Sequence, residues 1–146
     1  MAKRDISNLS DLQALVHDIA AELRGGEVLG LVGDLGTGKT TFTQLLAKEL
    51  GVTVEVKSPT FVLVREYPTG SEVGERGINQ LVHADAYRLE DESELWGIGF
   101  GDQAGEPSTV TVVEWADRVP GLQHLSGYRE LRFSVGVDGR RLVDIN

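Results

Sequence analysis

The chain has 146 residues, which suits one domain built around one hydrophobic core. It contains no cysteine, which excludes disulfides and cysteine-based metal sites, and its net charge of −9 argues against direct binding of nucleic acid. It has no apolar run long enough to span a bilayer and no signal-peptide core near its N-terminus, so we expect a cytoplasmic protein without membrane contact.

The first predicted element is a helix that begins near Ser10. Ser10 is expected to cap this helix, with Gln13 as the second member of a capping box. Apolar residues at helical spacing give the helix one buried stripe, and Gly25-Gly26 ends it. The stripe consists of Leu12, Leu15, Val16, Ile19 and Leu23.

Residues 33–41 read GDLGTGKTT and match the phosphate-binding P-loop pattern: a glycine, four residues, then Gly-Lys-Thr. Glycines let the backbone bend around a phosphate, Lys39 can reach the β- and γ-phosphates, and the Thr40 hydroxyl can ligate Mg²⁺. An apolar strand is predicted before the loop at 27–32 and a helix after it at 40–50, which is the context that a P-loop requires. The sequence therefore predicts a site for a nucleotide with Mg²⁺ rather than a glycine-rich turn.

Beyond this unit, hydrophobic alternation predicts further strands. They lie at residues 52–56 (weakly), 61–67, 81–84, 110–114, 129–137 and 141–145. The run at 110–114 is apolar and β-branched, as in the middle of a parallel sheet, and the last two strands are expected to form a hairpin around a two-residue Asp-Gly turn at 138–139. Residues 68–80 are expected to form a flexible hairpin connection, 95–98 a short helix and 99–107 a loop.

Two acids stand at the ends of predicted strands and are candidates for the second metal ligand of the nucleotide site. Val113 runs into Glu114, the shape of a Walker B strand with Glu in place of Asp, and Ala84 runs into Asp85 in the same way. A lone acid at a strand end would more simply face water. With a P-loop upstream, we expect at least one of the two acids to meet the Mg²⁺ shell.

Four further residues have a structural as well as a chemical interpretation. Thr60 lies in a loop like the switch loop of P-loop hydrolases, where a hydroxyl approaches the γ-phosphate or its metal, or it is a turn residue beside a proline. His83 is expected to pack or hydrogen-bond beside the sheet rather than to titrate. Trp115 lies by the nucleotide or in the core, and Arg88 pairs with phosphate or with an acid such as Asp85.

Four motifs together resemble the TsaE (YjeE) family of small bacterial P-loop ATPases, which are needed to make threonylcarbamoyladenosine in tRNA. They occur in the order and approximate spacing of that family and cover nearly the whole chain. The motifs are GDLGTGKTTF at 33–42, SPTF at 58–61, HADAYRL at 83–89 and VEW at 113–115. The connection between residues 67 and 81 and the short tail show nothing typical of the family, which bears on partner contacts rather than on the site.

The resemblance assigns roles to individual residues. It implies that Lys39 and the neighbouring backbone hold the phosphates, that Thr40 and Glu114 ligate Mg²⁺, and that Asp85 and Thr60 act in catalysis with Lys39 and Glu114. The expected nucleotide contacts are Ser10, Asp34, Leu35, Gly36, Thr37, Gly38, Lys39, Thr40, Thr41, Asp85, Trp115 and Arg140.

The same resemblance implies a fold and a function for the chain. The fold would be a single P-loop ATPase domain over residues 1–146, an α/β three-layer sandwich with a mixed central sheet whose later strands are antiparallel. The protein would bind Mg²⁺ and ATP and act on a complex of two partners, TsaB and TsaD. The tRNA would be reached only through that complex, which suits the acidic charge of the chain.

Two other functions use the same loop. A small-molecule kinase would transfer phosphate to an acceptor hydroxyl, but the segment that could serve as its lid, residues 90–105, has no Arg or Lys. A nucleotide-sensing binding module with negligible turnover would share most residues with a hydrolase. Beyond the acids named, the chain offers no evident catalytic base or arginine finger, so slow ATP hydrolysis that partners stimulate is expected.

Overall fold

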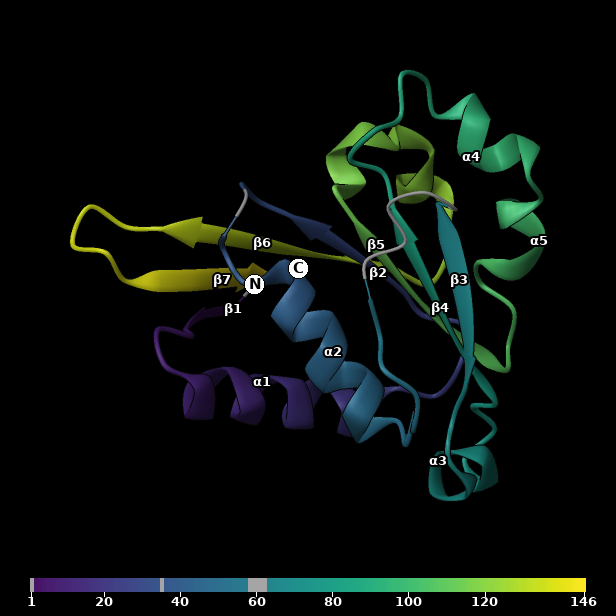
Figure 1. Cartoon of the computed structure of the whole chain (residues 1–146), viewed down its shortest axis with the longest axis horizontal. Helices are drawn as coiled ribbons and strands as arrows, with labels where there is room; N and C mark the ends of the chain where they lie inside the picture. Colours follow the sequence, from purple (N-terminus) through teal and green to yellow (C-terminus); the bar gives the residue numbers. More distant parts are fainter. Residues whose placement is uncertain (1, 35, 58–62) are drawn as a thin grey trace.

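Seven strands form one mixed sheet in the order β1-β7-β6-β2-β5-β4-β3 (Figure 1). The structure is a computed structural model that describes residues 2–34, 36–57 and 63–146. Its strands are β1 (Ala2–Asp5), β2 (Val28–Val32), β3 (Val64–Pro68), β4 (Gln80–Asp85), β5 (Thr109–Glu114), β6 (Tyr128–Val135) and β7 (Arg141–Ile145). Its helices are α1 (Leu9–Glu22), α2 (Lys39–Glu49), α3 (Ser71–Glu75), α4 (Ser93–Gly97) and α5 (Phe100–Gln103), with 3₁₀ turns η1 (Ala116–Arg118) and η2 (Pro120–His124).

The centre of the sheet is parallel and its edges are antiparallel. Strand β2 pairs in parallel with both β5 and β6, and β4 pairs in parallel with β5. Strand β3 is antiparallel to β4, β7 is antiparallel to β6, and β1 is antiparallel to β7. The predicted α/β fold with a mixed sheet is confirmed, with β5 in the parallel centre as its apolar run indicated.

Helices cover both faces of this sheet, which gives three layers (Figure 1). Leu29 and Leu31 of β2 pack in a core with α1 and α2, whereas Val28 and Val32 of the same strand pack in a second core with α4, α5 and the 3₁₀ turns. This alternation follows from the two-residue repeat of a strand. All five strand positions are buried, because both faces are covered.

Helix α1 presents the predicted apolar stripe to the core, and its residues Leu12, Leu15, Val16 and Ile19 are buried. The prediction of Ser10 as the cap is wrong. The side chain of Asn8 accepts the backbone N–H of Asp11 at 2.9 Å, so the helix begins before Ser10. Asn and Ser are near-equal as caps, and the sequence offered both within a few residues.

Several connections differ from expectation. Residues 52–56 form no strand: the Val56 carbonyl accepts the Gln44 amide of α2, and the segment packs on that helix instead of pairing. The expected flexible connection at 68–80 contains α3, which Val73 anchors in the core, and the expected loop at 99–107 contains α5, anchored by the buried Phe100. Ile78 is buried as well in the first segment and Ala104 in the second, so two apolar residues supply the burial that orders each segment.

The closing hairpin and the two ends of the chain also need correction. Five residues, 136–140, separate the paired residues of β6 and β7, so the connection is longer than the predicted two-residue turn. Strand β1 was not predicted. The first residues of the predicted strand 61–67 lie outside the described residues, and the described strand β3 starts at Val64.

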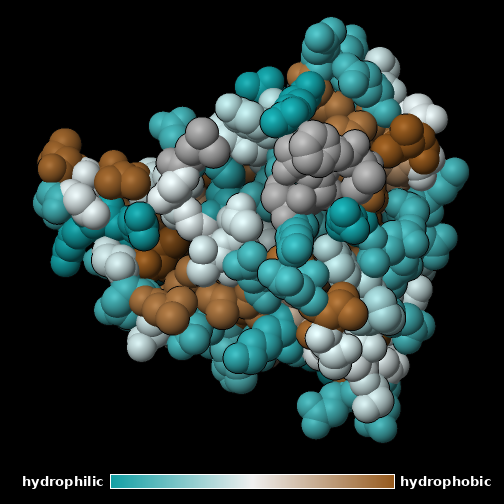
Figure 2. All heavy atoms as spheres, viewed as in Figure 1, coloured by the Kyte–Doolittle hydropathy of each residue, from teal (hydrophilic) through white to brown (hydrophobic). Residues whose placement is uncertain are grey.

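The β6–β7 hairpin projects from the body, at the left of Figure 1, and carries exposed hydrophobic side chains at its end (Figure 2). Those side chains are Val135 and the fully exposed Val137. Among the described residues, no helix combines the length and the apolar character needed to cross a bilayer.

Candidate functional site

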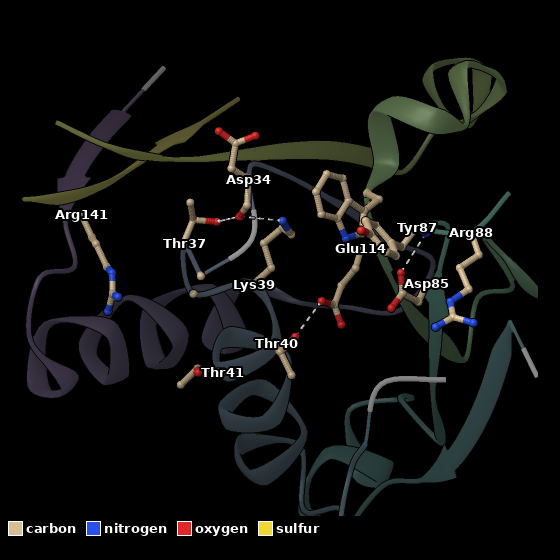
Figure 3. A pocket seen from close by; sticks show the side chains of 13 residues that line it. Asp34, Thr37, Lys39, Thr40, Thr41, Asp85, Tyr87, Arg88, Glu114 and Arg141 are labelled. Carbon is tan, nitrogen blue, oxygen red and sulfur yellow. Dashed lines mark hydrogen bonds between the residues drawn. The ribbon is translucent and has the colours of Figure 1, made fainter. Parts of the chain in front are cut away.

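A cavity of about 460 Å³ opens at the carboxyl ends of the parallel strands (Figure 3). One side, the loop wall, consists of Asp34 and residues 36–41. The other side, the strand-end wall, consists of residues 85, 87, 88, 114 and 115, which follow or end β4 and β5. Arg141 of β7 completes the lining. Ligands in open α/β sheets bind at this end of the strands, so the cavity lies where the fold favours a site.

The loop wall depends on glycine at two positions. A Cβ on Gly33 would lie 2.5 Å from the carbonyl oxygen of Phe133, so only glycine allows β6 to pass this closely. Gly38 has φ +111°, which side-chain-bearing residues rarely adopt. It precedes α2 without any side-chain cap, unlike Asn8 at α1. The first N–H groups of α2 and the positive end of its dipole are therefore available to an anion.

Lys39 is the cation of the loop wall. Its Nζ donates to the carbonyl oxygens of Gly33 and, at 3.1 Å, Asp34, and lies 3.9 Å from the centre of the Trp115 ring. Burial lowers the pKa of Lys39, and the nearby Glu114 carboxylate opposes that shift. A buried cation held mainly by carbonyl dipoles and an aromatic face would gain from a phosphate placed beside it.

The strand-end wall supplies carboxylates. Asp85 and Glu114 are register partners at the ends of the parallel strands β4 and β5. The Thr40 hydroxyl donates to Glu114 Oε1 at 2.9 Å, and this contact joins the two walls (Figure 3). Asp85 Oδ1 accepts the backbone N–H of Tyr87 at 3.0 Å, which turns the chain just after β4.

These oxygen donors fit Mg²⁺. In the described parts of the chain, no three His, Asp or Glu side chains cluster as a protein-only metal cage would require. Mg²⁺ in nucleotide sites uses instead one or two protein oxygens together with phosphates and waters. The pair formed by the Thr40 hydroxyl and the Glu114 carboxylate meets that requirement, because one neutral and one anionic oxygen converge at the cavity.

A cluster of aromatic and cationic side chains closes the site beside Glu114. Trp115 has a left-handed backbone (φ 59°, ψ 42°), which costs a non-glycine residue on the order of 1–3 kcal/mol. Its ring lies 5.0 Å from that of Tyr87, and the guanidinium of Arg118 lies 5.8 Å from the Trp115 ring. The unusual backbone directs the indole back over Lys39 rather than onward along β5.

The structure brings most of the predicted site residues together. Ten of them line the cavity: Asp34, Gly36, Thr37, Gly38, Lys39, Thr40, Thr41, Asp85, Glu114 and Trp115. The Thr37 hydroxyl donates to the Asp34 carbonyl at 2.7 Å and braces the loop. Leu35 and Thr60 lie outside the described residues.

Two predicted nucleotide contacts do not line this cavity. Ser10 is exposed on α1, and Arg140 pairs with Asp5 at 3.5 Å. Their neighbours take those places: Arg141 lines the cavity, and residues 7–9 line an adjoining hollow of about 140 Å³. The Ile6 N–H donates to the Arg141 carbonyl at 2.8 Å, and the Arg141 N–H donates to the Ser7 hydroxyl at 3.0 Å, which holds the two segments side by side.

Sequence reasoning missed three contributors: Arg141, the ring of Tyr87, and the contact between His83 and Glu114. His83 Nε2 lies 2.6 Å from Glu114 Oε2, and both side chains are almost fully buried. Tyr87 and His83 lie in the HADAYRL motif, so their presence near the site could have been expected. The contact partner of His83 could not, because it depends on the pairing of β4 with β5.

These features define an α/β protein in which a parallel strand, a glycine-rich loop and a helix follow one another as in a P-loop, with an acid at the end of the adjacent strand. The chain belongs to the TsaE family: the family model, "Threonylcarbamoyl adenosine biosynthesis protein TsaE", matches residues 6–142.

Similar proteins agree with this assignment. A Bacillus subtilis protein named tRNA threonylcarbamoyladenosine biosynthesis protein TsaE is 43% identical over 109 residues, which cover 75% of this chain and 63% of that protein. The Aquifex aeolicus protein of the same name is 42% identical over 110 residues, covering 74% and 71%. The crystal structure of Bacillus subtilis YdiB superposes with a TM-score of 0.71 at 30% identity, covering 99% of this chain and 83% of that one. The matched stretch thus spans slightly less than two thirds of the Bacillus relative.

Proposed function

We propose that this protein binds Mg-ATP in the cavity and hydrolyses it, as an accessory ATPase of threonylcarbamoyladenosine modification of tRNA. The contact that carries the proposal is the 2.9 Å hydrogen bond from the Thr40 hydroxyl to the Glu114 carboxylate. It joins a glycine-rich loop and its lysine to an acid at a strand end, which is the combination that holds a metal-bound nucleotide. The names of the relatives support the place in tRNA modification.

The residues of the cavity divide the work between them. Lys39 and the uncapped start of α2 bind and orient the phosphates, and Thr40 and Glu114 hold the metal. Mg²⁺, when bound, neutralises the charge that develops on the transferred phosphoryl group. Asp85, at the end of the neighbouring strand, is placed to orient water at the open side of the cavity, and the Trp115 ring shields Lys39 from solvent.

Turnover by the protein alone should be slow. The arginines among the described lining residues are Arg88 and Arg141, which lie on opposite sides of the cavity (Figure 3). We therefore propose that TsaB and TsaD bind this protein and stimulate hydrolysis, that tRNA is reached only through them, and that the complex acts in the cytoplasm.

The test is ATP hydrolysis measured with and without purified TsaB–TsaD and tRNA. We expect a low basal rate that rises with the two partners and is lost in Lys39→Ala. Fast turnover by the protein alone, or no stimulation by the partners, would contradict the accessory role. Phosphate transfer to a small acceptor in place of water would favour a kinase.

A separate measurement distinguishes hydrolysis from nucleotide sensing. Glu114→Ala is expected to keep partner assembly and to lose both turnover and function in cells. If this variant still supports threonylcarbamoyladenosine formation while it hydrolyses no ATP, the protein is a nucleotide-sensing module.

A further inference from the structure

His83 occupies an unusual place for a polar side chain. It lies in the middle of β4 with no solvent exposure, on the face of the sheet that α2 covers. Its neighbour on the adjacent strand, Val112, belongs to the apolar core beneath α1 and α2. A buried polar group in such surroundings is costly unless it is hydrogen-bonded, so its partner is informative.

The position of the ring proton follows from the contacts of the two ring nitrogens. Nε2 lies 2.6 Å from Glu114 Oε2, whereas Nδ1 is buried and has no hydrogen-bond partner among the described residues. A proton on Nδ1 would leave a buried N–H unpaired and place two acceptors opposite each other at Nε2. A proton on Nε2 makes the hydrogen bond to the carboxylate and leaves only a lone pair unpaired. His83 is therefore the donor and Glu114 the acceptor.

Glu114 then accepts one donor on each oxygen. The Thr40 hydroxyl donates to Oε1 at 2.9 Å, and His83 Nε2 donates to Oε2 at 2.6 Å. Two bonds on opposite oxygens fix the plane of the carboxylate, which one bond alone would leave free to rotate. His83, the partner of Oε2, is buried, whereas Thr40, the partner of Oε1, lines the cavity.

We propose that His83 is a positioning residue, which holds the Glu114 carboxylate so that its second oxygen meets Thr40 and a metal at the nucleotide. This inference rests on the proposed function. Groups that orient a metal ligand typically change metal affinity about 10–100-fold when they are removed. His83 acts on the orientation of the carboxylate, and neither His83 nor Glu114 needs to change its charge.

Three substitutions separate the hydrogen bond from the packing. In His83→Gln the amide nitrogen reaches about as far as Nε2, so the donor is kept. In His83→Asn the amide nitrogen ends near the position of Nδ1, so the donor is withdrawn. His83→Leu fills the space with an apolar side chain. Thr111→Val is the matched control. Thr111 is a buried residue of the adjacent strand on the other face of the sheet, and its hydroxyl has no hydrogen-bond partner in the described part of the chain.

The first readout is the Mg²⁺ dependence of ATP binding, measured by calorimetry at fixed nucleotide with increasing Mg²⁺, alongside binding in EDTA. We expect His83→Asn and His83→Leu to need about 10–100-fold more Mg²⁺. His83→Gln and Thr111→Val should resemble the wild type, and all four variants should keep their ATP affinity in EDTA. A uniform loss with and without Mg²⁺ would mean that His83 only supports packing, and would overturn the inference.

The second readout needs no variant of His83 and no metal. The chain has only three histidines, so ¹⁵N spectra of the rings can be assigned with His17→Gln and His124→Gln. We expect the proton of His83 on Nε2, with a resonance that shifts in Glu114→Leu. A proton on Nδ1, or a resonance that ignores Glu114→Leu, would overturn the inference even if the His83 variants failed to fold.

The two proposals fail in different ways. If wild-type protein binds ATP with no dependence on Mg²⁺, the proposed function fails and the inference fails with it. If the wild type needs Mg²⁺ and His83→Leu needs no more of it, only the inference about His83 fails.

Discussion

The two walls of the cavity are built in opposite ways. The loop wall is one continuous stretch that presents a helix N-terminus and the cation of Lys39. The strand-end wall brings together Asp85 and Glu114, which lie almost thirty positions apart in the chain and meet because β4 pairs with β5. The first wall is suited to anions and the second to a cation, and the bond from Thr40 to Glu114 joins them.

Each wall is therefore sensitive to a different kind of substitution. The loop wall depends on local backbone geometry, so it can be damaged at a single glycine. The strand-end wall depends on strand register, because a slip of one residue would turn Asp85 and Glu114 to the opposite face of the sheet. The buried bond between His83 and Glu114 lies within that pairing and belongs to the same register.

The largest expected effect is on the strand-end wall. Glu114→Gln keeps the shape of the side chain and an acceptor for Thr40 but removes the charge. Removing a metal ligand should have a larger effect than removing a residue that orients the ligand. We therefore expect Mg²⁺-dependent turnover to fall by at least about 100-fold. Steady-state ATP hydrolysis with partners measures this, with the exposed Glu106→Gln as control. Near-normal turnover would remove Glu114 from the metal site.

Lys39→Ala tests the loop wall. Charge-assisted hydrogen bonds contribute about 1.5–3 kcal/mol, so ATP affinity should fall about 10–100-fold in a nucleotide titration. An unchanged titration would remove the nucleotide from this cavity. The control is Lys48→Ala, an exposed lysine of the same helix.

The same lysine predicts a dependence of stability on pH. Burial lowers the pKa of Lys39 in the folded state, so the unfolded state binds more protons between the two pKa values and the contribution of this group to stability rises with pH there. Below the lowered pKa, the charged ammonium of Lys39 destabilises the protein without nucleotide. Lys39→Met should therefore leave the free energy of unfolding at neutral pH unchanged or raised. A clear loss of stability would contradict the direction of the shift.

A smaller effect is expected at the bend of the loop wall. Gly38→Ala has room for its methyl group, whose nearest neighbour is an Ile6 carbon at 3.9 Å, but it must adopt φ +111°. We expect the free energy of unfolding to fall by about 1–3 kcal/mol in denaturant titrations. Gly97→Ala, which meets no atom within 4 Å in α4, should be stabilising by about 0.4–1 kcal/mol. If Gly38→Ala and Gly97→Ala changed the free energy of unfolding equally, the backbone conformation at Gly38 would not require glycine.

The next smaller effect is expected at the start of α1, which has a side-chain cap, unlike the start of α2. Asn8→Ala removes the side-chain cap and should lower the free energy of unfolding by about 0.5–2 kcal/mol. Ser10→Ala, at an exposed helical position, should change it by less than about 0.5 kcal/mol. The reverse ranking would restore Ser10 as the cap. A fall of ATP affinity in Ser10→Ala would restore the predicted nucleotide contact.

The smallest effect is expected at Arg141 of β7, which completes the lining of the cavity beside the loop wall. Arg141→Ala should weaken ATP binding by about threefold to tenfold, the worth of one ordinary hydrogen bond. Arg140→Ala should leave the affinity near that of the wild type, because Arg140 forms exposed ion pairs with Asp5 and Asp138. If Arg140→Ala weakens binding more than Arg141→Ala, the arginine predicted from the sequence resemblance is the correct one.

Prediction from the sequence succeeded where the signal was local and repeated. The stripe of α1 from Leu12 to Ile19 shows a helical period, and β5 is an apolar run buried at every position, so in both elements burial shapes several neighbouring residues. It failed where only one or two buried residues decide. Val73 with Ile78, and Phe100 with Ala104, order short helices in segments expected to be loops, and two apolar residues are too few to show a periodic pattern.

The two arginines at the start of β7 show the same limit at the site. Arg140 and Arg141 are neighbours, and side chains of neighbouring residues in an extended strand point to opposite faces. Which of them meets the cavity depends on where the hairpin loop ends, and that loop spans 136–140 rather than the predicted two residues. Arg140 was named from the family resemblance, whereas the place of Arg141 at the cavity follows from the pairing of β7 with β6.

The loop wall can be predicted from the sequence, because the contacts of a P-loop form among residues a few positions apart and their spacing can be read along the chain. The sequence also marks Glu114 and Asp85 as acids at strand ends. Three contacts need the folded structure: Glu114 accepts from both Thr40 and His83, Trp115 turns back over Lys39, and Arg141 lines the cavity. These contacts depend on strand register and on the direction of side chains across the sheet, which arise only when distant segments pair.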